Sequence, residues 1–409
     1  MRAERFSIGH GTDPAGAAGR VHALAPGAES VTEAVREIVD EVRRDGDVAL
    51  RRYVERFDGV SGAPEVPREA RDEALAGLDP AVRAGLEVAI ANVRAVAEAD
   101  LGADVEVALP QGQTVTLRDV PVRRAAVYVP GGRAPYPSTV VMGVVAARAA
   151  GVDEVVVCAP GMHPVILAAC ALCGADEVFA MGGAHAIAGL AYGTETIRRA
   201  DVIVGPGSLW VQEAKRLVSG DVGIDGFAGP SDVVVLASAG ADPDLVSIDL
   251  AAQAEHGAGT VVCAVSPDAD LLDAITIEPG DAAAALVDAH DLETAFAFAE
   301  AFAPEHLELV GPDAEALAPR VRSAGALFVG RASGTAFGDY VAGSNHTLPT
   351  GGAARFASQL GPRHFRRRMS EVRIGPAAAE LARAAAPVAR AEGFERHAAS
   401  MEVRENAAR

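Results

Sequence analysis

The most constraining feature of this sequence is the alternation of short apolar runs and helical patterns between residues 124 and 237. The apolar runs are rich in β-branched side chains and are bounded by turn residues, which indicates buried strands. Strands that alternate with helices predict an α/β unit built on a mostly parallel sheet. The expected strands cover residues 125–129, 154–159, 177–181, 201–204 and 232–237, and the expected helices cover residues 138–150, 163–174, 183–192 and 208–218.

Glycine-rich turns stand where several of these strands lead into helices. They are Pro130-Gly131-Gly132, Gly182-Gly183 and Gly205-Pro206-Gly207. Glycine allows the backbone to approach a ligand closely at the carboxyl ends of parallel strands, where open α/β sheets bind their ligands. No complete GxGxxG fingerprint follows any of these strands, so the turns alone do not identify a dinucleotide.

A second strand–helix pattern begins after residue 240, and both ends of the chain look helical. The predicted fold is therefore α/β, with two Rossmann-like parallel-sheet α/β domains plus helical N- and C-terminal extensions. The basic run at residues 365–369 is interpreted as a solvated helix face, with phosphate binding as the alternative. The expected domains are residues 1–29, residues 30–123 together with 233–358, residues 124–232, and a helical tail at 359–409 that ends in a short strand around 401–403.

Composition and charge argue against several classes of function. The chain has 409 residues and a formal net charge of −20, which repels phosphate backbones, so we expect no nucleic-acid partner. It lacks an uninterrupted apolar run of about 20 residues and a secretory signal pattern, so we expect no membrane partner and a cytoplasmic location. The four cysteines lie in apolar patterns and are expected to be free thiols in the core: Cys158, Cys170, Cys173 and Cys263.

Several short polar stretches supply the candidate functional residues. Their nitrogen and oxygen atoms suit Zn²⁺, and an adjacent Glu-His pair is suited to proton transfer near neutral pH. Taken alone, each stretch also has a plainer interpretation, such as a capped histidine, a helix start or an ordinary loop. The residues are Gln253, His256, Glu305, His306, Asp339, His346, Glu392 and His397.

In context, these stretches closely resemble the histidinol dehydrogenase family. The matching segments read AAQAEHG, FAPEHLELV, FGDYVAGSNHTLPTGG and AEGFERH, and they follow the family's order from about residue 30 to the end. The resemblance implies oxidation of L-histidinol to L-histidine through an aldehyde, with NAD and one Zn²⁺ per subunit. It also implies the zinc ligands, which correspond here to Gln253, His256, Asp339 and His397.

The resemblance assigns catalytic and substrate-binding roles as well. His306 corresponds to the base that takes protons from the alcohol, and Glu305 to the residue that activates water for conversion of the aldehyde into an acid. The metal itself stays open, because Mn²⁺ or Co²⁺ would accept the same ligands. The implied substrate contacts are Ser231, His346 and Glu392, together with the zinc ligands, Glu305 and His306.

NAD binding and assembly rest on the resemblance alone. Tyr128 matches a family contact to NAD, whereas His185 stands where glutamine is usual and Ser208 where asparagine is usual. Both replacements can still form hydrogen bonds. The family's C-terminal tail crosses to the partner subunit, so the resemblance implies a homodimer in which His397 completes the neighbour's site.

Three other functions are weighed against this hypothesis. A paralogous zinc- and NAD-dependent dehydrogenase could act on another small hydroxylated compound. A zinc hydrolase that uses Glu305 would turn over without NAD, but the sequence lacks a zincin pattern such as HExxH. A non-catalytic small-molecule binder is disfavoured by the concentration of titratable residues in the motifs.

Overall fold

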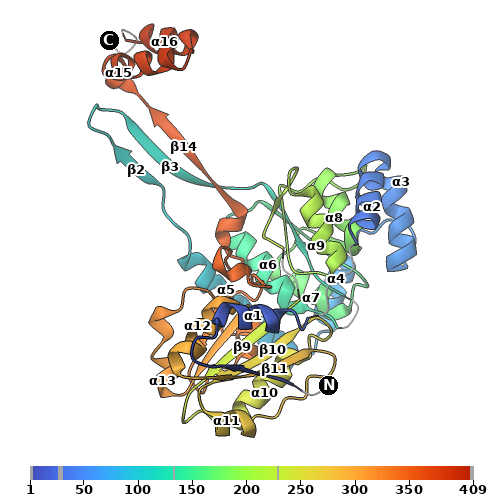
Figure 1. Cartoon of the computed structure of the whole chain (residues 1–409). Coiled ribbons are helices and arrows are strands. Elements are labelled where there is room, and N and C mark those ends of the chain that lie inside the picture. The colour runs from blue at the N-terminus through green and yellow to red at the C-terminus, as the bar shows by residue number, and fades with distance from the viewer. Residues whose placement is uncertain (1–2, 26–30, 132–133, 228–229, 406–409) are drawn as a thin grey trace. The chain divides into compact units, whose positions relative to one another are not determined.

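The computed structural model describes residues 3–25, 31–131, 134–227 and 230–405. Gly132, part of one expected glycine turn, lies outside the described residues. The chain divides into two compact units (Figure 1). Unit 1 comprises Met1–Asp100 and Val122–Phe365 and contains two parallel sheets, whereas unit 2 comprises Leu101–Pro121 and Arg366–Arg409 and contains a small antiparallel sheet.

Six parallel strands form the larger sheet of unit 1. Alternate residues of β9 face opposite apolar layers: Val234 and Leu236 pack with α1 and α12, and Val233 and Val235 pack with α10 and α11. Helices therefore cover both faces, as a buried parallel sheet requires (Figure 1). The strand order is β1 (Glu4–Ile8), β11 (Ala283–Ala289), β10 (Val261–Ser266), β9 (Asp232–Ala237), β12 (His306–Val310) and β13 (Ala326–Val329), and the helices are α1 (Pro14–His22), α10 (Pro243–Ala254), α11 (Ala269–Ala274) and α12 (Leu292–Phe302).

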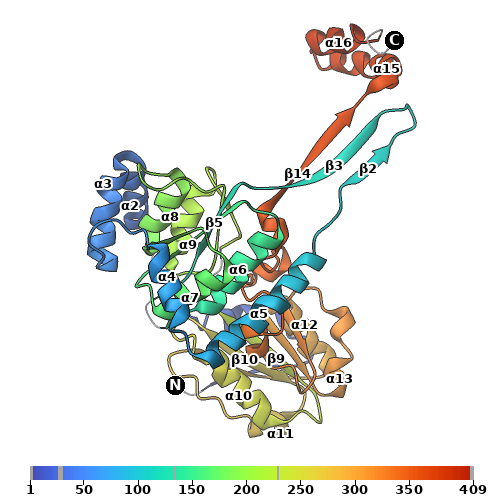
Figure 2. The ribbon, with the colours of Figure 1, turned by 180° about the vertical axis from the view of Figure 1, so that it is seen from behind.

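Five parallel strands form the second sheet of unit 1. Its apolar layers contain α5, α6 and α7 on one face and α2, α8 and α9 on the other (Figure 2). The expected elements between residues 124 and 218 agree with the structure to within one residue, and the predicted fold class is confirmed. The strand order is β6 (Glu177–Ala180), β5 (Glu154–Ala159), β4 (Arg124–Tyr128), β7 (Val202–Val204) and β8 (Gly223–Ile224), and the helices are α2 (Thr32–Asp45), α5 (Pro80–Ala99), α6 (Pro137–Ala149), α7 (Pro164–Cys173), α8 (Gly183–Tyr192) and α9 (Leu209–Val218).

The N-terminal segment differs from the expected helical extension. It begins with β1, which pairs in parallel with β11 from Glu4 opposite Ala285 to Ile8 opposite Ala289. Phe6 and Ile8 alternate with polar residues, and the Ile8 side chain is buried in the sheet's apolar layer. A strand of five residues is too short for its pattern to stand out from the surrounding sequence, and its partner lies about 280 residues away in the sequence.

Unit 2 corrects the prediction for the C-terminal segment. Residues Arg366–Arg373 form β14, an antiparallel partner of β3, and not a helix face (Figure 2). The guanidinium of Arg368 makes two 2.8 Å hydrogen bonds to Asp119 on β3, so the basic run is stabilised across the strands. The expected strand around residues 401–403 is also wrong, because α16 continues to Glu402. The elements are β2 (Val105–Ala108), β3 (Thr114–Pro121), β14, α15 (Ala378–Ala391) and α16 (Glu395–Glu402).

Two smaller expectations concern the core and the membrane. All four cysteines are buried and free, as their apolar surroundings in the sequence predicted. None of the helices in the described part of the chain has the length and apolarity needed to span a bilayer.

Candidate active site

A cavity of about 270 Å³ in unit 1 is lined by most of the candidate residues. From the five-stranded sheet it is lined by residues that follow the carboxyl ends of strands, including Pro130 after β4 and Pro206 after β7. From the six-stranded sheet it is lined by residues at the amino ends of strands, including Ser231, Thr260 and His306. One wall of the cavity is the side of the five-stranded sheet where its strands end, here called its carboxyl edge. The other wall is the side of the six-stranded sheet where its strands begin, here called its amino edge.

Helix ends give these two walls opposite polarity. On the six-stranded side, α10 ends next to the cavity, with Gln253 in its last turn and His256 just beyond it. On the five-stranded side, α6 begins with Pro137 and Ser138, and α9 begins at Leu209, two residues after Gly207. A helix carries partial negative charge at its C-terminus and partial positive charge at its N-terminus. One wall therefore favours a cation and the other favours an anion.

Glu305 and His306 lie buried at the amino end of β12. The expectation of a helix start at this point is wrong, because α12 ends at Phe302 and Ala303 takes a left-handed conformation with φ 52°. Strand β12 then begins at His306, which pairs with Val233 on β9 and Ala326 on β13. Pro304, which in the sequence suggested a helix start, instead follows the C-terminus of α12, a position where proline is also common.

The carboxylate of Glu305 accepts two hydrogen bonds, and one of the two donors is itself held by a third residue. Ser231 donates its hydroxyl proton to Glu305 Oε2, the backbone N–H of Asp232 donates to the same atom at 3.1 Å, and Gln253 Nε2 donates to Ser231 Oγ. Burial raises the pKa of Glu305 to about 7, and the neighbouring carboxylate of Asp232 acts in the same direction. A carboxyl group with such a pKa can exchange protons at neutral pH.

Asp232 is a site residue that the sequence analysis did not identify. Its Oδ1 accepts a 2.6 Å hydrogen bond from the backbone N–H of Glu305, and its Oδ2 accepts one of 3.2 Å from Gly351. The side chain is buried, and burial raises its pKa. The available signal was an acidic residue that opens an otherwise valine-rich strand, directly after Ser231. Asp232 fixes the backbone from which Glu305 and His306 project.

The imidazole of His306 lies between acidic groups. Its Nδ1 donates to the backbone carbonyl of Asp232 at 3.3 Å and lies 3.7 Å from Glu305 Oε2, while its Nε2 lies 3.7 Å from Asp339 Oδ1. Burial lowers the pKa of His306, but the carboxylates of Glu305 and Asp339 outweigh this effect and raise the pKa to about 9. The ring therefore holds its proton until nearby negative charge is neutralised.

Asp339 and His346 are positioned by a short helix and the segment after it. The sequence placed Asp339 in a loop, whereas it lies in α14 (Thr335–Tyr340). His346 Nδ1 donates to the Asp339 carbonyl at 2.9 Å, and its Nε2 accepts from the Thr139 hydroxyl of α6 at 3.3 Å. Burial lowers the pKa of His346, which favours the neutral ring that this pattern requires. For Asp339, burial is outweighed by the hydrogen bond and positive charge of His306, which lower its pKa and keep it anionic.

Three of the predicted zinc ligands have the properties that a metal site requires. Gln253 Oε1 is buried and has no hydrogen-bond partner among the described residues, while its amide nitrogen is engaged by Ser231. His256 donates from Nδ1 to the Gln253 carbonyl at 3.0 Å, and this hydrogen bond selects the tautomer whose lone pair is on Nε2. Together with anionic Asp339, this donor set fits Zn²⁺. Within the described ranges, no three or more His, Cys, Asp or Glu residues are gathered closely enough to hold a metal ion by themselves.

The remaining predicted ligand and one predicted substrate contact belong to unit 2. Glu392 follows the last residue of α15, and His397 lies in α16 with its ring centroid 5.1 Å from that of Phe394. Both side chains are exposed in the single chain. Their assignment to the site stays a prediction.

The three predicted NAD contacts differ in accessibility. Ser208 is exposed in the turn before α9. Tyr128 is buried at the end of β4, where its hydroxyl accepts a 3.1 Å hydrogen bond from Gly183 and burial raises its pKa. His185 is also buried, and its Nε2 donates to Asp58 Oδ2 at 2.8 Å. Ser208 is therefore the one of these three side chains that is open to a ligand in this structure.

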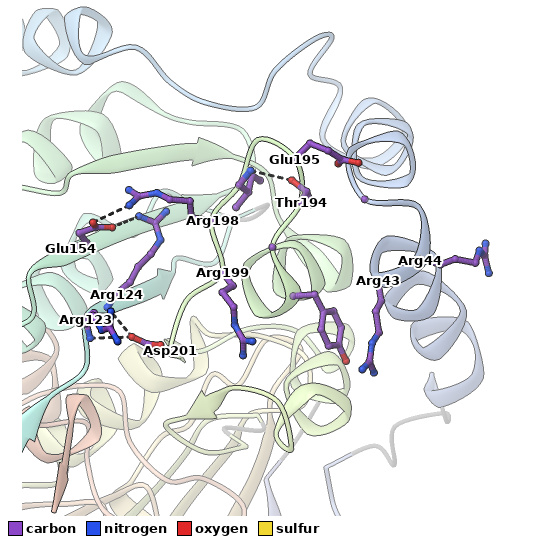
Figure 3. A pocket seen from close by; sticks show the side chains of 14 residues that line it. Arg43, Arg44, Arg123, Arg124, Glu154, Thr194, Glu195, Arg198, Arg199 and Asp201 are labelled. Atoms are coloured by element: carbon purple, nitrogen blue, oxygen red, sulfur yellow. Dashed lines mark hydrogen bonds and ion pairs between the residues drawn. The ribbon is translucent and has the colours of Figure 1, made fainter.

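A larger cavity, of about 810 Å³, lies at the amino edge of the five-stranded sheet (Figure 3). Arginines dominate its lining, but Arg124 and Arg198 are paired with Glu154 at 2.8 and 2.9 Å. The hydrogen bonds from these arginines lower the pKa of Glu154, so this carboxylate is held in its charged form. This cavity is larger, but it has no acid–base pair comparable to Glu305 and His306 among its described lining residues.

Two parallel β-sheets covered by helices, with a buried acid–base pair in the cavity between them, define an α/β protein whose site is suited to proton transfer. The sequence profile of the histidinol dehydrogenase family matches residues 25–405. The chain belongs to this family and is an oxidoreductase, as the sequence motifs indicated.

Individual relatives agree with this placement. The histidinol dehydrogenases of Thermobifida fusca and Pseudomonas savastanoi pv. phaseolicola are 43% and 41% identical to this chain over 401 residues, which cover 92% of this chain and 92% and 90% of theirs. The crystal structure of histidinol dehydrogenase from Elizabethkingia anophelis matches with a TM-score of 0.90 at 27% identity, covering 98% of each chain. The similarity thus extends over both units of the chain.

Proposed function

We propose that this protein oxidises L-histidinol to L-histidine through histidinaldehyde in two NAD-linked steps, the last reaction of histidine biosynthesis. The observation that carries the proposal is the buried Glu305–His306 pair at a cavity that also contains a set of zinc-type ligands. Membership of the histidinol dehydrogenase family supports the substrate. The two residues of the pair have different environments, which suits two successive proton transfers with different requirements.

Zinc would be held by Gln253, His256 and Asp339 of unit 1 together with His397. When bound, zinc would orient the nitrogen atoms of the substrate and take no part in the redox chemistry. Three features favour a cation at this wall: Gln253 Oε1, which has no hydrogen-bond partner in the described part of the chain, the anionic carboxylate of Asp339, and the C-terminal end of α10.

NAD would bind on the opposite wall, at the carboxyl edge of the five-stranded sheet. When bound, it would accept a hydride in each of the two steps. The start of α9, directly after the glycine turn at residues 205–207, presents backbone N–H groups suited to the pyrophosphate. Exposed Ser208 can add a hydrogen bond at this position.

In the first step, His306 would take the hydroxyl proton of the alcohol. The carboxylates of Glu305 and Asp339 hold a proton on this ring in the unliganded chain. When Asp339 serves as a cation ligand, its charge no longer retains that proton, and His306 becomes available as a base. The 3.7 Å separation between His306 Nε2 and Asp339 Oδ1 makes this coupling direct.

In the second step, Glu305 would activate the water that adds to the aldehyde. Its pKa of about 7 means that a large fraction of the carboxyl group is ionised at neutral pH and can accept a proton from water. The hydroxyl of Ser231 and the amide of Gln253 orient the carboxylate. Burial of the pair also shields the reactive aldehyde from bulk solvent.

We further propose that the site is completed in a homodimer, with His397 and Glu392 contributed by a second copy. Three predicted ligands lie in unit 1 and the fourth lies in unit 2, which is the division that a reciprocal exchange requires. Mixing His397→Ala chains with Asp339→Ala chains tests this assembly. In a mixed dimer one site would be intact, so about a quarter of wild-type activity should return after random reassortment. No recovery, once native mass spectrometry has detected the mixed dimer, would place His397 in its own subunit's site.

The proposed reaction is tested by incubating the protein with L-histidinol with and without NAD. We expect L-histidine only when NAD is present. A hydrolase cannot oxidise an alcohol to an acid, so no L-histidine from L-histidinol, together with NAD-independent cleavage of an ester of L-histidine, would support the zinc hydrolase instead. His185 and Ser208 differ from the residues usual in the family, so the rate with L-histidinol should also be compared with the rates with other small amino alcohols. A strong preference for one of those compounds would support the paralogous dehydrogenase.

A further inference from the structure

The turn Gly205-Pro206-Gly207 is held against the sheet by close backbone packing. Pro206 and Gly207 line the active-site cavity. Gly205 has φ +117°, and a Cβ atom at this position would lie 2.1 Å from the backbone oxygen of Tyr128. Only glycine fits such an approach. The cavity wall therefore depends on how Gly205 is fixed.

An ion pair binds both polar backbone groups of Gly205. Lys215, on α9, donates from Nζ to the Gly205 carbonyl at 3.0 Å and pairs with Asp225 Oδ1. Asp225 Oδ2 accepts a 2.7 Å hydrogen bond from the Gly205 N–H. The lysine side chain has 0% and the aspartate side chain 7% of its surface exposed. One buried pair thus satisfies the donor and the acceptor of a single residue in the wall.

The identity of the cation is itself informative. The sequence contains 36 lysine and arginine residues, and Lys215 is its only lysine. A compact ammonium on an unbranched stem can reach a carbonyl and a carboxylate in a closed space, whereas the planar guanidinium needs more room. Lys215 is fully buried and takes no part in the proposed proton transfers, so its contacts with Gly205 and Asp225 indicate a role in fixing the backbone.

We propose that Lys215 is a positioning residue that, together with Asp225, fixes the 205–207 turn as the nucleotide-binding wall of the cavity. Its loss should weaken binding of NAD and NADH and leave the chemical steps largely intact. The assignment of NAD to this wall rests on the proposed function. The positioning of the turn by the ion pair rests on the contacts of Gly205.

Two variants separate positioning from simple charge compensation. Lys215→Met leaves the Asp225 carboxylate buried without its cation and should lower stability. Lys215→Met combined with Asp225→Asn removes that charge and keeps an acceptor for the Gly205 N–H. If the pair positions the turn, the double variant should recover stability but keep a KM for NAD raised by about tenfold, the effect of one lost hydrogen bond, with kcat within about twofold of wild type.

The chain also offers a binding measurement that does not depend on turnover. Trp210 is the only tryptophan in the sequence and lies at the start of α9, partly exposed and five residues before Lys215. Titration with NADH, followed by quenching of Trp210 fluorescence, should give a dissociation constant about tenfold weaker in the double variant. A double variant with wild-type NADH affinity and wild-type KM would reduce Lys215 to a structural role and overturn the proposal.

The single lysine provides a second test in the unaltered protein. A small amine-acetylating reagent should modify Lys215 in the unfolded chain but only slowly in the native chain, and saturating NADH should slow the reaction further. Equal native rates with and without NADH would contradict a coupling between this pair and the nucleotide wall. A protein that binds NADH with these properties but does not oxidise L-histidinol would refute the proposed function and leave the role of Lys215 standing.

Discussion

The two edges that form the active-site cavity differ in what their residues are suited to do. The amino edge of the six-stranded sheet carries buried titratable side chains, and there burial raises the pKa of Glu305 to about 7. The carboxyl edge of the five-stranded sheet presents glycine turns whose backbone is fixed by contacts such as those of Lys215 and Asp225. One edge is therefore suited to chemistry and the other to holding a ligand, so substitutions at the first should change kcat and substitutions at the second should change KM for NAD.

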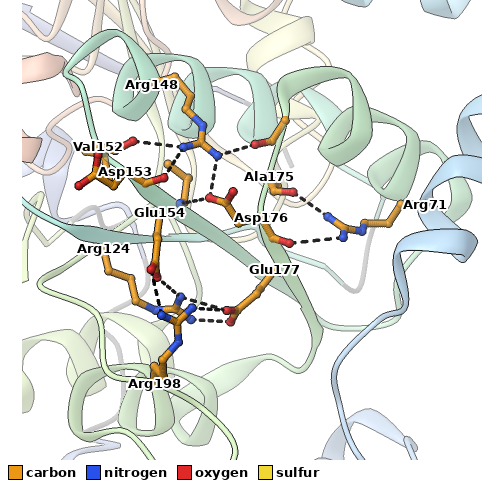
Figure 4. Close-up of polar contacts among 12 residues, drawn as sticks. Arg71, Arg124, Arg148, Val152, Asp153, Glu154, Ala175, Asp176, Glu177 and Arg198 are labelled. Carbon is orange, nitrogen blue, oxygen red and sulfur yellow. Dashed lines mark hydrogen bonds and ion pairs between the residues drawn. The ribbon is translucent and has the colours of Figure 1, made fainter.

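The opposite edge of the five-stranded sheet carries a network of charged side chains that has no catalytic role. There, Arg124 binds Glu154 at 2.8 Å and Glu177 at 2.6 Å, and Arg198 binds the same two carboxylates (Figure 4). Hydrogen bonds from Arg198 and Arg124 lower the pKa of Glu154, and those bonds outweigh burial to lower the pKa of Glu177. Charges at this edge are stabilised, whereas the charge of Glu305 is destabilised. The direction of the shift separates a structural network from a reactive group.

The largest effects are expected at Glu305 and His306. His306→Asn should lower kcat for L-histidinol by about 10²–10⁴-fold, because a positioned acid or base contributes this much. Glu305→Gln should slow oxidation of supplied histidinaldehyde much more than oxidation of the alcohol. Steady-state assays with each substrate measure the two losses, and KM for NAD serves as the internal control. Equal losses in both steps for both variants would remove the proposed division of roles.

Asp339→Asn should cause the next largest change. Loss of an anionic ligand should weaken zinc binding by at least about 100-fold, because even the residues around metal ligands contribute 10–100-fold. Zinc content after dialysis and activity should fall together. Asp313→Asn, an exposed substitution beside the six-stranded sheet, is the matched control. Full activity with a metal-free site would refute the zinc assignment.

The pH dependence of aldehyde oxidation should follow Glu305. Because burial raises its pKa to about 7, the carboxyl group is protonated and inactive as a base below this pH and ionised above it. The rate should therefore rise by about tenfold per pH unit below 7 and level off above it. In Glu305→Gln the remaining rate should lose this rise. A rate that falls as the pH increases from 6 to 8 has the wrong sign for a Glu305 base.

The smallest effect on catalysis is expected at Arg124. Arg124→Met should lower the free energy of unfolding by about 1–3 kcal/mol, because it leaves two carboxylates without a buried partner. KM for NAD and kcat should both stay within about twofold of wild type at temperatures where the variant is folded. Chemical denaturation and steady-state kinetics measure these two quantities. A tenfold change in KM would mean that the amino edge of this sheet also governs nucleotide binding.

Local patterns in the sequence predicted most of the strands but not their distant partners. The runs that became β4, β5 and β9 are continuous apolar segments bounded by turns, so their positions were evident. Strand β14 was missed because its stabilising partner, Asp119, lies about 250 residues away from Arg368 in the sequence. The helix expected at 291–301 and the strand expected at 307–310 were also placed to within one residue, and only the interpretation of the intervening proline as a helix start was wrong.

The candidate site shows the same limit. The motifs identified Glu305, His306 and Asp339, which the fold brings to one cavity. Asp232 and Lys215 were not identified, because their roles come from contacts to Glu305 and Gly205 that only the folded chain creates.

The most direct test of the proposed function is the number of NADH molecules formed per L-histidinol consumed. Purified protein with a limiting amount of L-histidinol and excess NAD should produce about two NADH per substrate, because each of two oxidation steps transfers one hydride. L-histidine, measured by chromatography, should equal the substrate consumed. A ratio of one, with histidinaldehyde as the product, would show that the Glu305 step does not occur. No NADH formation by protein with full zinc occupancy would contradict the account as a whole.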